Sequence, residues 1–116
     1  MLSPDMQRLV RIWDYCSAIN RSMQRFGADW DSFSSDKDYQ SVIAFQLLQI
    51  GELVSNLSAD FRADTNELMN WAEIKGLRNI VVHDYGRIKP EIVWQIITGD
   101  IPDLKAFCEK HLPPEF

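Results

Sequence analysis

Two long segments of this chain repeat apolar residues every three to four positions, which is the period of an amphipathic helix. They cover residues 4–26 and about 36–57, and no segment alternates apolar and polar residues as a half-buried strand does. Ser3 is placed to cap the first helix, and Ser35 or Asp36 the second. The predicted inward stripes are Met6, Leu9, Val10, Trp13, Cys16, Met23 and Phe26, then Tyr39, Val42, Ile43, Gln46, Leu47, Ile50, Leu53, Val54 and Leu57.

Shorter elements follow the two long helices. Residues 27–35 are predicted to be a connector, and the polar, mixed segment 58–70 is predicted to hold a short helical turn. A third helix is predicted to begin at Glu67 or Trp71 and to end near Val82.

Turn signals divide the rest of the chain. A turn over residues 84–89 precedes a fourth helix, Pro90–Ile97, and Gly99 is predicted to end that helix. A last short helix is predicted to start at about Pro102. The sequence therefore predicts an all-α protein: a single domain over residues 1–116 that forms an antiparallel bundle of four to five helices.

Composition limits what such a chain can be. With 116 residues, of which 46% are hydrophobic and 25% charged, the chain can bury one core without disulfides. Cys16 and Cys108 belong to no paired-cysteine motif, so we expect two buried thiols in a reducing compartment. No apolar run reaches the ~20 residues of a membrane span, and charged residues interrupt any secretory signal. We therefore expect a cytoplasmic protein with no membrane association.

The charge distribution favours contact with a few phosphates over coating of a long nucleic acid. The net charge is −5, but between Lys75 and Lys89 the bases outnumber the single acid, Asp84. The first helix also carries basic residues off its apolar stripe, which form either a solvated face or an RNA-contacting flank. These residues are Arg8, Arg11, Arg21 and Arg25.

Arg78, His83 and Tyr85 form the grouping with clear catalytic potential. Histidine exchanges protons near neutral pH, and arginine is a permanent cation whose planar fork fits phosphate oxygens. Together they suit attack of an RNA 2′-hydroxyl on its own phosphodiester. His83 would transfer a proton, and Arg78 would stabilise the charge that builds on the phosphate. This chemistry requires no metal and no other cofactor.

The spacing of this pair constrains how it can work. Five residues place Arg78 and His83 roughly 140° apart around an ideal helix. Both can face one pocket if the helix ends near His83, or if two subunits share the pocket around a two-fold axis. We therefore expect a homodimer with this segment at or near the interface. A structural interpretation stays open, in which His83 stabilises a helix C-terminus and Arg78 only pairs with Glu73 or Glu52.

Residues 76–85 resemble the R-x4-H-x-Y motif of the HepT-like toxins, which belong to the HEPN superfamily of small helical ribonucleases and nucleotide-binding domains. They read Gly76-Leu77-Arg78-Asn79-Ile80-Val81-Val82-His83-Asp84-Tyr85. Ile50-Gly51-Glu52, Trp71 and Val93-Trp94 agree with the same family, so the similarity runs from about residue 3 to residue 107. One departure is Asn70, which stands where many members have proline, and we expect it to change the entry into the third helix.

The resemblance implies a HEPN-like bundle, a dimer whose cleft gathers both motifs, and metal-independent RNA cleavage by Arg78 and His83. Asn79 would be a supporting hydrogen-bonding residue. Glu52 would orient Arg78 or His83, with a simple buried salt bridge as the alternative. Family members are usually toxins encoded beside a minimal nucleotidyltransferase antitoxin of the MntA type. That antitoxin transfers AMP from ATP onto the motif tyrosine, here Tyr85, where the added charge and bulk would exclude RNA.

Three functions are consistent with these residues. The first is a metal-independent ribonuclease toxin that cleaves an RNA substrate. The second is a non-catalytic nucleotide- or substrate-binding subunit of a partner nucleotidyltransferase, in which Arg78 and His83 hold a phosphate without breaking a bond. The third is a purely structural oligomerisation domain. A titratable histidine near the arginine favours the ribonuclease, because binding alone does not require one.

Overall fold

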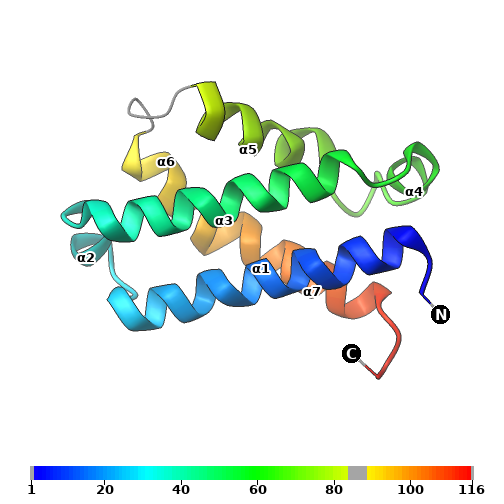
Figure 1. The fold of residues 1–116 in the computed structure, drawn as a ribbon, viewed down its shortest axis with the longest axis horizontal. Helices are drawn as coiled ribbons and strands as arrows, with labels where there is room; N and C mark the ends of the chain where they lie inside the picture. The colour runs from blue at the N-terminus through cyan, green and yellow to red at the C-terminus, as the bar shows by residue number, and fades with distance from the viewer. Residues whose placement is uncertain (1, 84–88, 116) are drawn as a thin grey trace.

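The computed structural model describes residues 2–83 and 89–115, except for the side chains of residues 79–83. Every element in these ranges is helical, which confirms the all-α prediction (Figure 1). The elements are α1 (Pro4–Phe26), α2 (Trp30–Ser34), α3 (Lys37–Ser55), α4 (Ala59–Asp64), α5 (Trp71–His83), α6 (Pro90–Gln95), a π-helical turn η1 (Ile96–Asp100) and α7 (Ile101–His111).

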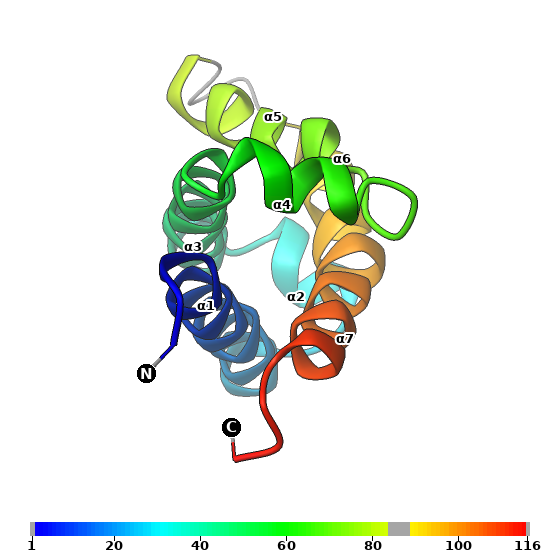
Figure 2. The same ribbon diagram turned by 90° about the vertical axis from the view of Figure 1, so that its right-hand side faces the viewer.

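The four longest helices, α1, α3, α5 and α7, form the bundle. α1 and α3 run antiparallel, α7 packs behind α1, and α5 lies along α3 (Figures 1 and 2). Their facing sides, together with α2, enclose one cluster of buried apolar side chains. The most enclosed of these are Leu9, Ile12, Cys16, Ile19, Phe33, Tyr39, Ile43, Ile50, Val54, Leu104 and Cys108.

The predicted bounds of α1 are confirmed at both ends. The Ser3 hydroxyl accepts a hydrogen bond from the Met6 backbone N–H at 3.2 Å, and Gly27, with a φ of 121°, ends the helix. Asp5 in the first turn also accepts bonds from the Ser58 N–H (2.8 Å) and hydroxyl (2.6 Å). Burial opposes ionisation of Asp5, but these two bonds and nearby Arg8 outweigh it and lower the pKa of this carboxyl. The start of α1 is thereby tied to the start of α4.

The structure confirms the inward stripe of α3, with one exception. Asp36 caps the helix by accepting bonds from the Asp38 and Tyr39 N–H groups, and the other predicted members of the stripe are buried. Val42 was predicted to face inward but is 36% exposed. It lies beside Phe45, which is 56% exposed, so α3 presents apolar surface to solvent as well as to the core.

Two short helices lie where the sequence indicated loops or a single turn. The connector 27–35 contains α2, which Asp29 caps by accepting a bond from the Ser32 N–H at 2.8 Å. The helical turn expected within 58–70 is α4, capped by Ser58. Each helix has a clear cap but is too short to show a hydrophobic period.

The prediction that Gly99 ends the fourth helix is wrong. α6 continues through η1 into α7 without a break, and Gly99 does not adopt a left-handed conformation. Pro102 has no N–H to donate to the carbonyl four residues earlier. The turn before Pro102 is a π-helical turn, which is wider than a turn of an α-helix. In that turn the Ile101 N–H bonds to the Ile96 carbonyl five residues back. One continuous helical segment, from α6 through η1 to α7, therefore replaces the two predicted helices.

Both cysteines are buried thiols, as expected. Burial raises the pKa of Cys16 to about 12 and also raises the pKa of Cys108, so neither ionises readily at neutral pH. None of the described helices is long and apolar enough to cross a membrane.

Candidate active site

α5 carries the candidate catalytic residues, and its start is fixed by Asn70. The Asn70 side-chain oxygen accepts a bond from the Glu73 N–H at 3.2 Å, and its amide group bonds the Glu73 carboxylate at 3.4 Å. Asparagine is among the strongest helix-capping residues. The departure from proline noted in the sequence thus gives α5 a capped start.

Trp71 anchors the first turn of α5 in the core. Its indole N–H donates to the Thr65 hydroxyl at 2.8 Å, and its ring packs edge-on against Phe107 with centroids 5.2 Å apart. Ile74 and Leu77 continue the buried stripe along the helix. This stripe leaves Arg78, the next residue after Leu77, on the side of α5 that faces solvent and α3.

Arg78 pairs with Glu52 where α5 lies along α3. Its Nε atom donates to the Glu52 Oε1 atom, and the two side chains are 50% and 42% exposed. Glu73 instead bonds Asn70, so Glu52 is the partner that the structure selects from the two predicted. An arginine paired through Nε still carries four N–H donors on its terminal nitrogens. Such an arginine can hold a carboxylate and a phosphate at the same time.

The other candidate residues are placed only in part. Asn79 follows Arg78 in α5, and His83 is the last residue of that helix, but both side chains lie outside the described residues. Tyr85 lies outside them entirely. Arg78 and His83 share one helix, which on ideal geometry separates them by roughly 140°. The structure therefore brings Arg78 and Glu52 together and does not test the remaining site residues.

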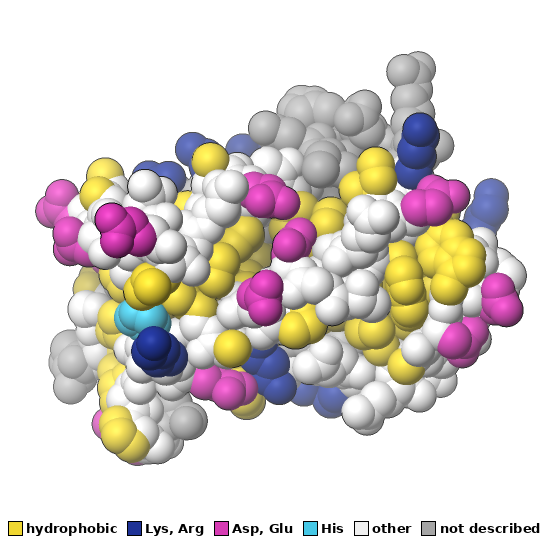
Figure 3. Space-filling view, turned by 180° about the vertical axis from the view of Figure 1, so that it is seen from behind, with side chains coloured by type: hydrophobic (Ala, Val, Ile, Leu, Met, Phe, Trp, Pro, Cys, Tyr) yellow, Lys and Arg dark blue, Asp and Glu magenta, His cyan; other side chains and the backbone are white. Residues whose placement is uncertain are grey.

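A pocket of about 450 Å³ lies on the opposite face of the molecule, between α7 and the start of α5. Figure 3 shows hydrophobic side chains in this hollow and acidic side chains beside it. His111 lines it, but its ring stacks on Phe107 with centroids 4.0 Å apart and Nδ1 lies 2.9 Å from the Phe107 carbonyl. Arg78, the candidate catalytic residue whose side chain is described, does not line this pocket. Among the side chains described, no three acidic, histidine or cysteine residues are grouped to hold a metal ion.

The basic residues around the site differ in their environment. Lys75, nearly one turn before Arg78, is exposed. On α1, Arg8 lies 3.7 Å from Asp5, and Arg11, Arg21 and Arg25 are exposed. These positions fit a solvated face and fit an RNA-contacting flank equally well.

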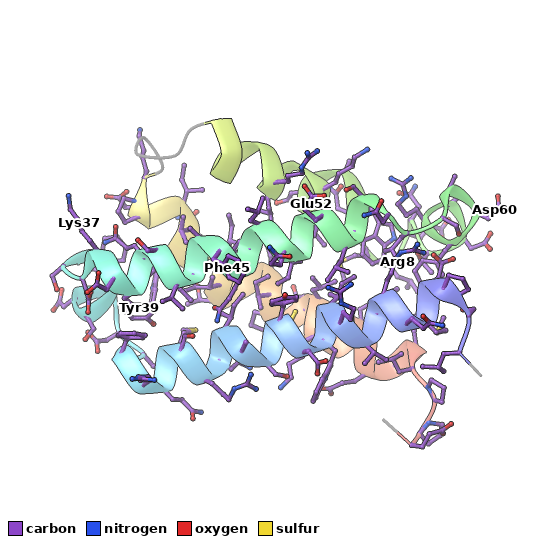
Figure 4. All side chains as sticks on the ribbon, viewed as in Figure 1. Arg8, Lys37, Tyr39, Phe45, Glu52 and Asp60 are labelled. Atoms are coloured by element: carbon purple, nitrogen blue, oxygen red, sulfur yellow. The ribbon has the colours of Figure 1, made fainter. Side chains whose placement is uncertain are left out.

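The exposed apolar face of α3 is the feature that sequence reasoning missed. Val42, Phe45 and Glu52 share one side of the helix, because spacings of three and seven residues return to nearly the same direction. Figure 4 labels Phe45 and Glu52 along α3. The sequence of α3 contains these exposed apolar residues as a second stripe beside the core stripe. Because α3 is apolar over much of its surface, the two stripes cannot be told apart from the sequence.

Fold and site together define a small helical protein with a solvent-facing arginine held between two helices and a histidine farther along the same helix. The chain belongs to the Ribonuclease HepT-like family, whose model matches residues 15–111.

Relatives of known name agree with this family. "Putative RNase TTE0752" from Caldanaerobacter subterraneus subsp. tengcongensis is 30% identical over 89 residues, which cover 77% of this chain and 79% of the relative. "Probable ribonuclease HepT" from Thermococcus cleftensis is 31% identical over 81 residues, covering 70% and 73%. "Putative RNase MJ0127" from Methanocaldococcus jannaschii is 35% identical over 81 residues, covering 69% and 66%. No solved structure matches the chain significantly.

Proposed function

We propose that this protein is a metal-independent endoribonuclease toxin built on Arg78 and His83. The observation that carries the proposal is the position of Arg78, whose side chain is half exposed beside α3 and held through Nε by Glu52. A pair this exposed contributes only about 0–1 kcal/mol to stability, so the fold gains little from it. In a chain of a ribonuclease family, an oriented and accessible guanidinium is suited to a phosphate.

The proposed reaction is an internal transfer within RNA. The 2′-hydroxyl oxygen attacks the adjacent phosphorus, the bond to the 5′ oxygen of the next nucleotide breaks, and a cyclic phosphate and a free 5′-hydroxyl result. His83 handles one of the protons that must move, and Arg78 stabilises the negative charge on the phosphate oxygens. Asn79 supports the pair by hydrogen bonding, and Glu52 orients Arg78.

A second copy of the chain is proposed to complete the site. Val42 and Phe45 expose apolar surface on the same side of α3 as Glu52, and Phe45 lies two helical turns from it. Exposed apolar surface of this kind marks interaction sites. A copy related by a two-fold axis would cover this face and bring two motifs to one cleft.

Phe45→Glu is expected to convert the dimer to a monomer and to lower RNA cleavage with it. The charge would have to be buried without a partner in the proposed interface, whereas in the monomer it faces water. Analytical ultracentrifugation measures the change. Leu68→Glu is the matched control, because Leu68 is similarly exposed, at 59%, but lies beside the pocket on the opposite face. A dimer retained by Phe45→Glu would contradict this interface.

Control by a partner is proposed to act at Tyr85. A minimal nucleotidyltransferase antitoxin of the MntA type would transfer AMP from ATP to the tyrosine oxygen, with pyrophosphate leaving. The nucleotide would place negative charge and bulk two residues from His83, where the RNA phosphate must bind. Addition of AMP would therefore neutralise the toxin by excluding its substrate.

Cleavage of total cellular RNA in EDTA tests the proposal directly. Purified protein whose intact mass shows no AMP is expected to cut RNA with the metal chelated, because side chains alone carry the reaction. Cleavage only after magnesium is restored would contradict the metal-independent mechanism. No cleavage under either condition would favour the non-catalytic subunit, with Arg78 and His83 as ligands for a phosphate.

A further inference from the structure

Gly51 is buried in α3 directly beneath Arg78. A Cβ atom on Gly51 would lie 2.9 Å from the Arg78 backbone nitrogen, 3.0 Å from its Cβ atom and 3.3 Å from its Cα atom. These atoms belong to the backbone or are bonded directly to it, so no side-chain rotation relieves the contact. Any side chain at position 51 would therefore have to push α5 away from α3 at Arg78.

Glu52, the next residue, holds the other end of the same side chain. Gly51 sets where the Arg78 side chain begins, and Glu52 contacts the guanidinium where it ends. Gly51 therefore sets the distance between the Arg78 backbone and α3, and Glu52 sets the direction in which the Arg78 side chain points.

The other helical glycines do not share this environment. Among the atoms that the structure describes, a Cβ atom on Gly76 or on Gly99 would meet none within 4 Å. Glycine inside a helix destabilises that helix relative to alanine, so the buried glycine in the last turns of α3 needs a packing reason. Contact with the Arg78 backbone supplies that reason.

We infer that Gly51 is a positioning residue for RNA cleavage. Its missing side chain sets the distance from α3 at which Arg78 meets the phosphate in the transition state. The inference rests on the proposed ribonuclease function and adds to it a residue that touches no substrate. A displacement of about 1 Å at a catalytic group can cost about 10²-fold in rate, so a single methyl group is sufficient to matter.

The test compares Gly51→Ala with Gly76→Ala, which adds the same methyl group to α5 at a position where no described atom lies within 4 Å. Gly51→Ala is expected to lower kcat for a defined RNA oligonucleotide by about 10- to 100-fold with little change in KM, because Arg78 acts on charge that develops in the transition state. Gly76→Ala is expected to keep wild-type kcat. In an Arg78→Ala background, adding Gly51→Ala is expected to cause no further loss, since the effect acts through Arg78.

Equal kcat in Gly51→Ala and Gly76→Ala would overturn the inference while leaving the proposed function intact. The inference would also be overturned if Gly51→Ala lowered kcat by the same factor in the Arg78→Ala background as in the wild type, because the effect would then not act through Arg78. If Gly51→Ala is unfolded by circular dichroism, the Gly51→Ala/Gly76→Ala double variant is measured. If the double variant also fails to fold, Gly51 is required for folding and the inference is overturned. A wild-type protein that cleaves no RNA would instead refute the proposed function, and this inference with it.

Discussion

His83→Ala is expected to lower the rate of RNA cleavage by about 10²- to 10⁴-fold, the usual contribution of a general acid or base. Arg78→Ala is expected to lower it by about 10²- to 10³-fold, the usual effect of removing one donor to a charge that develops in the transition state. Arg78→Ala is expected to stay folded, because the Arg78 side chain is half exposed and its ion pair adds little stability. Single-turnover cleavage of a defined RNA measures the rates, and circular dichroism checks the fold.

Two further variants separate catalysis from simple charge. Arg78→Lys keeps the positive charge but loses the planar fork, so it is expected to recover only part of the lost rate. Lys110→Ala removes an exposed base near the end of α7, beside the pocket that Arg78 does not line, and is expected to cleave RNA at the wild-type rate. Wild-type activity in His83→Ala or Arg78→Ala would show that the reaction occurs elsewhere in the molecule.

Trp71→Ala is expected to destabilise the protein by about 3–5 kcal/mol, as truncation of a large buried aromatic side chain does. The indole is buried against Phe107 and bonded to Thr65, so alanine leaves a cavity at the start of α5. Small domains have a total stability of about 5–15 kcal/mol, so this loss is a large part of it. Urea denaturation followed by circular dichroism measures the free energy of unfolding.

Trp71→Phe is the control for this prediction. It keeps most of the aromatic packing but removes the N–H that bonds Thr65, and is expected to cost about 1–3 kcal/mol. A stability of Trp71→Ala within 1 kcal/mol of wild type would mean that α5 is not anchored through this side chain.

The helix starts were the most predictable part of the fold. Ser3 and Asp36 are capping residues whose bonds run to backbone groups within three residues, so local sequence is sufficient to identify them. The pairing of Arg78 with Glu52 was predicted only as one of two alternatives. Choosing between them required the packing of α5 on α3, which no local pattern encodes.

The errors share one physical cause. Gly99 has the chemistry of a helix stop, yet Ile97 and Leu104 on either side pack into the same core and keep the helical segment continuous. Val42 fits the period of the buried stripe, but none of the described helices covers it, and it is 36% exposed. In each case a tertiary contact decides what the local signal means.

The anchoring of the helices on either side of residues 84–88 has a consequence for evolution. α5 is fixed by Trp71, and the helix that begins at Pro90 is fixed by Val93 in the core and by Trp94, which lies 5.4 Å from Phe33 between ring centroids. Residues 84–88 therefore join two elements that hold their places independently. The two anchors can therefore change in sequence separately, because the loss of one does not remove the contacts that hold the other.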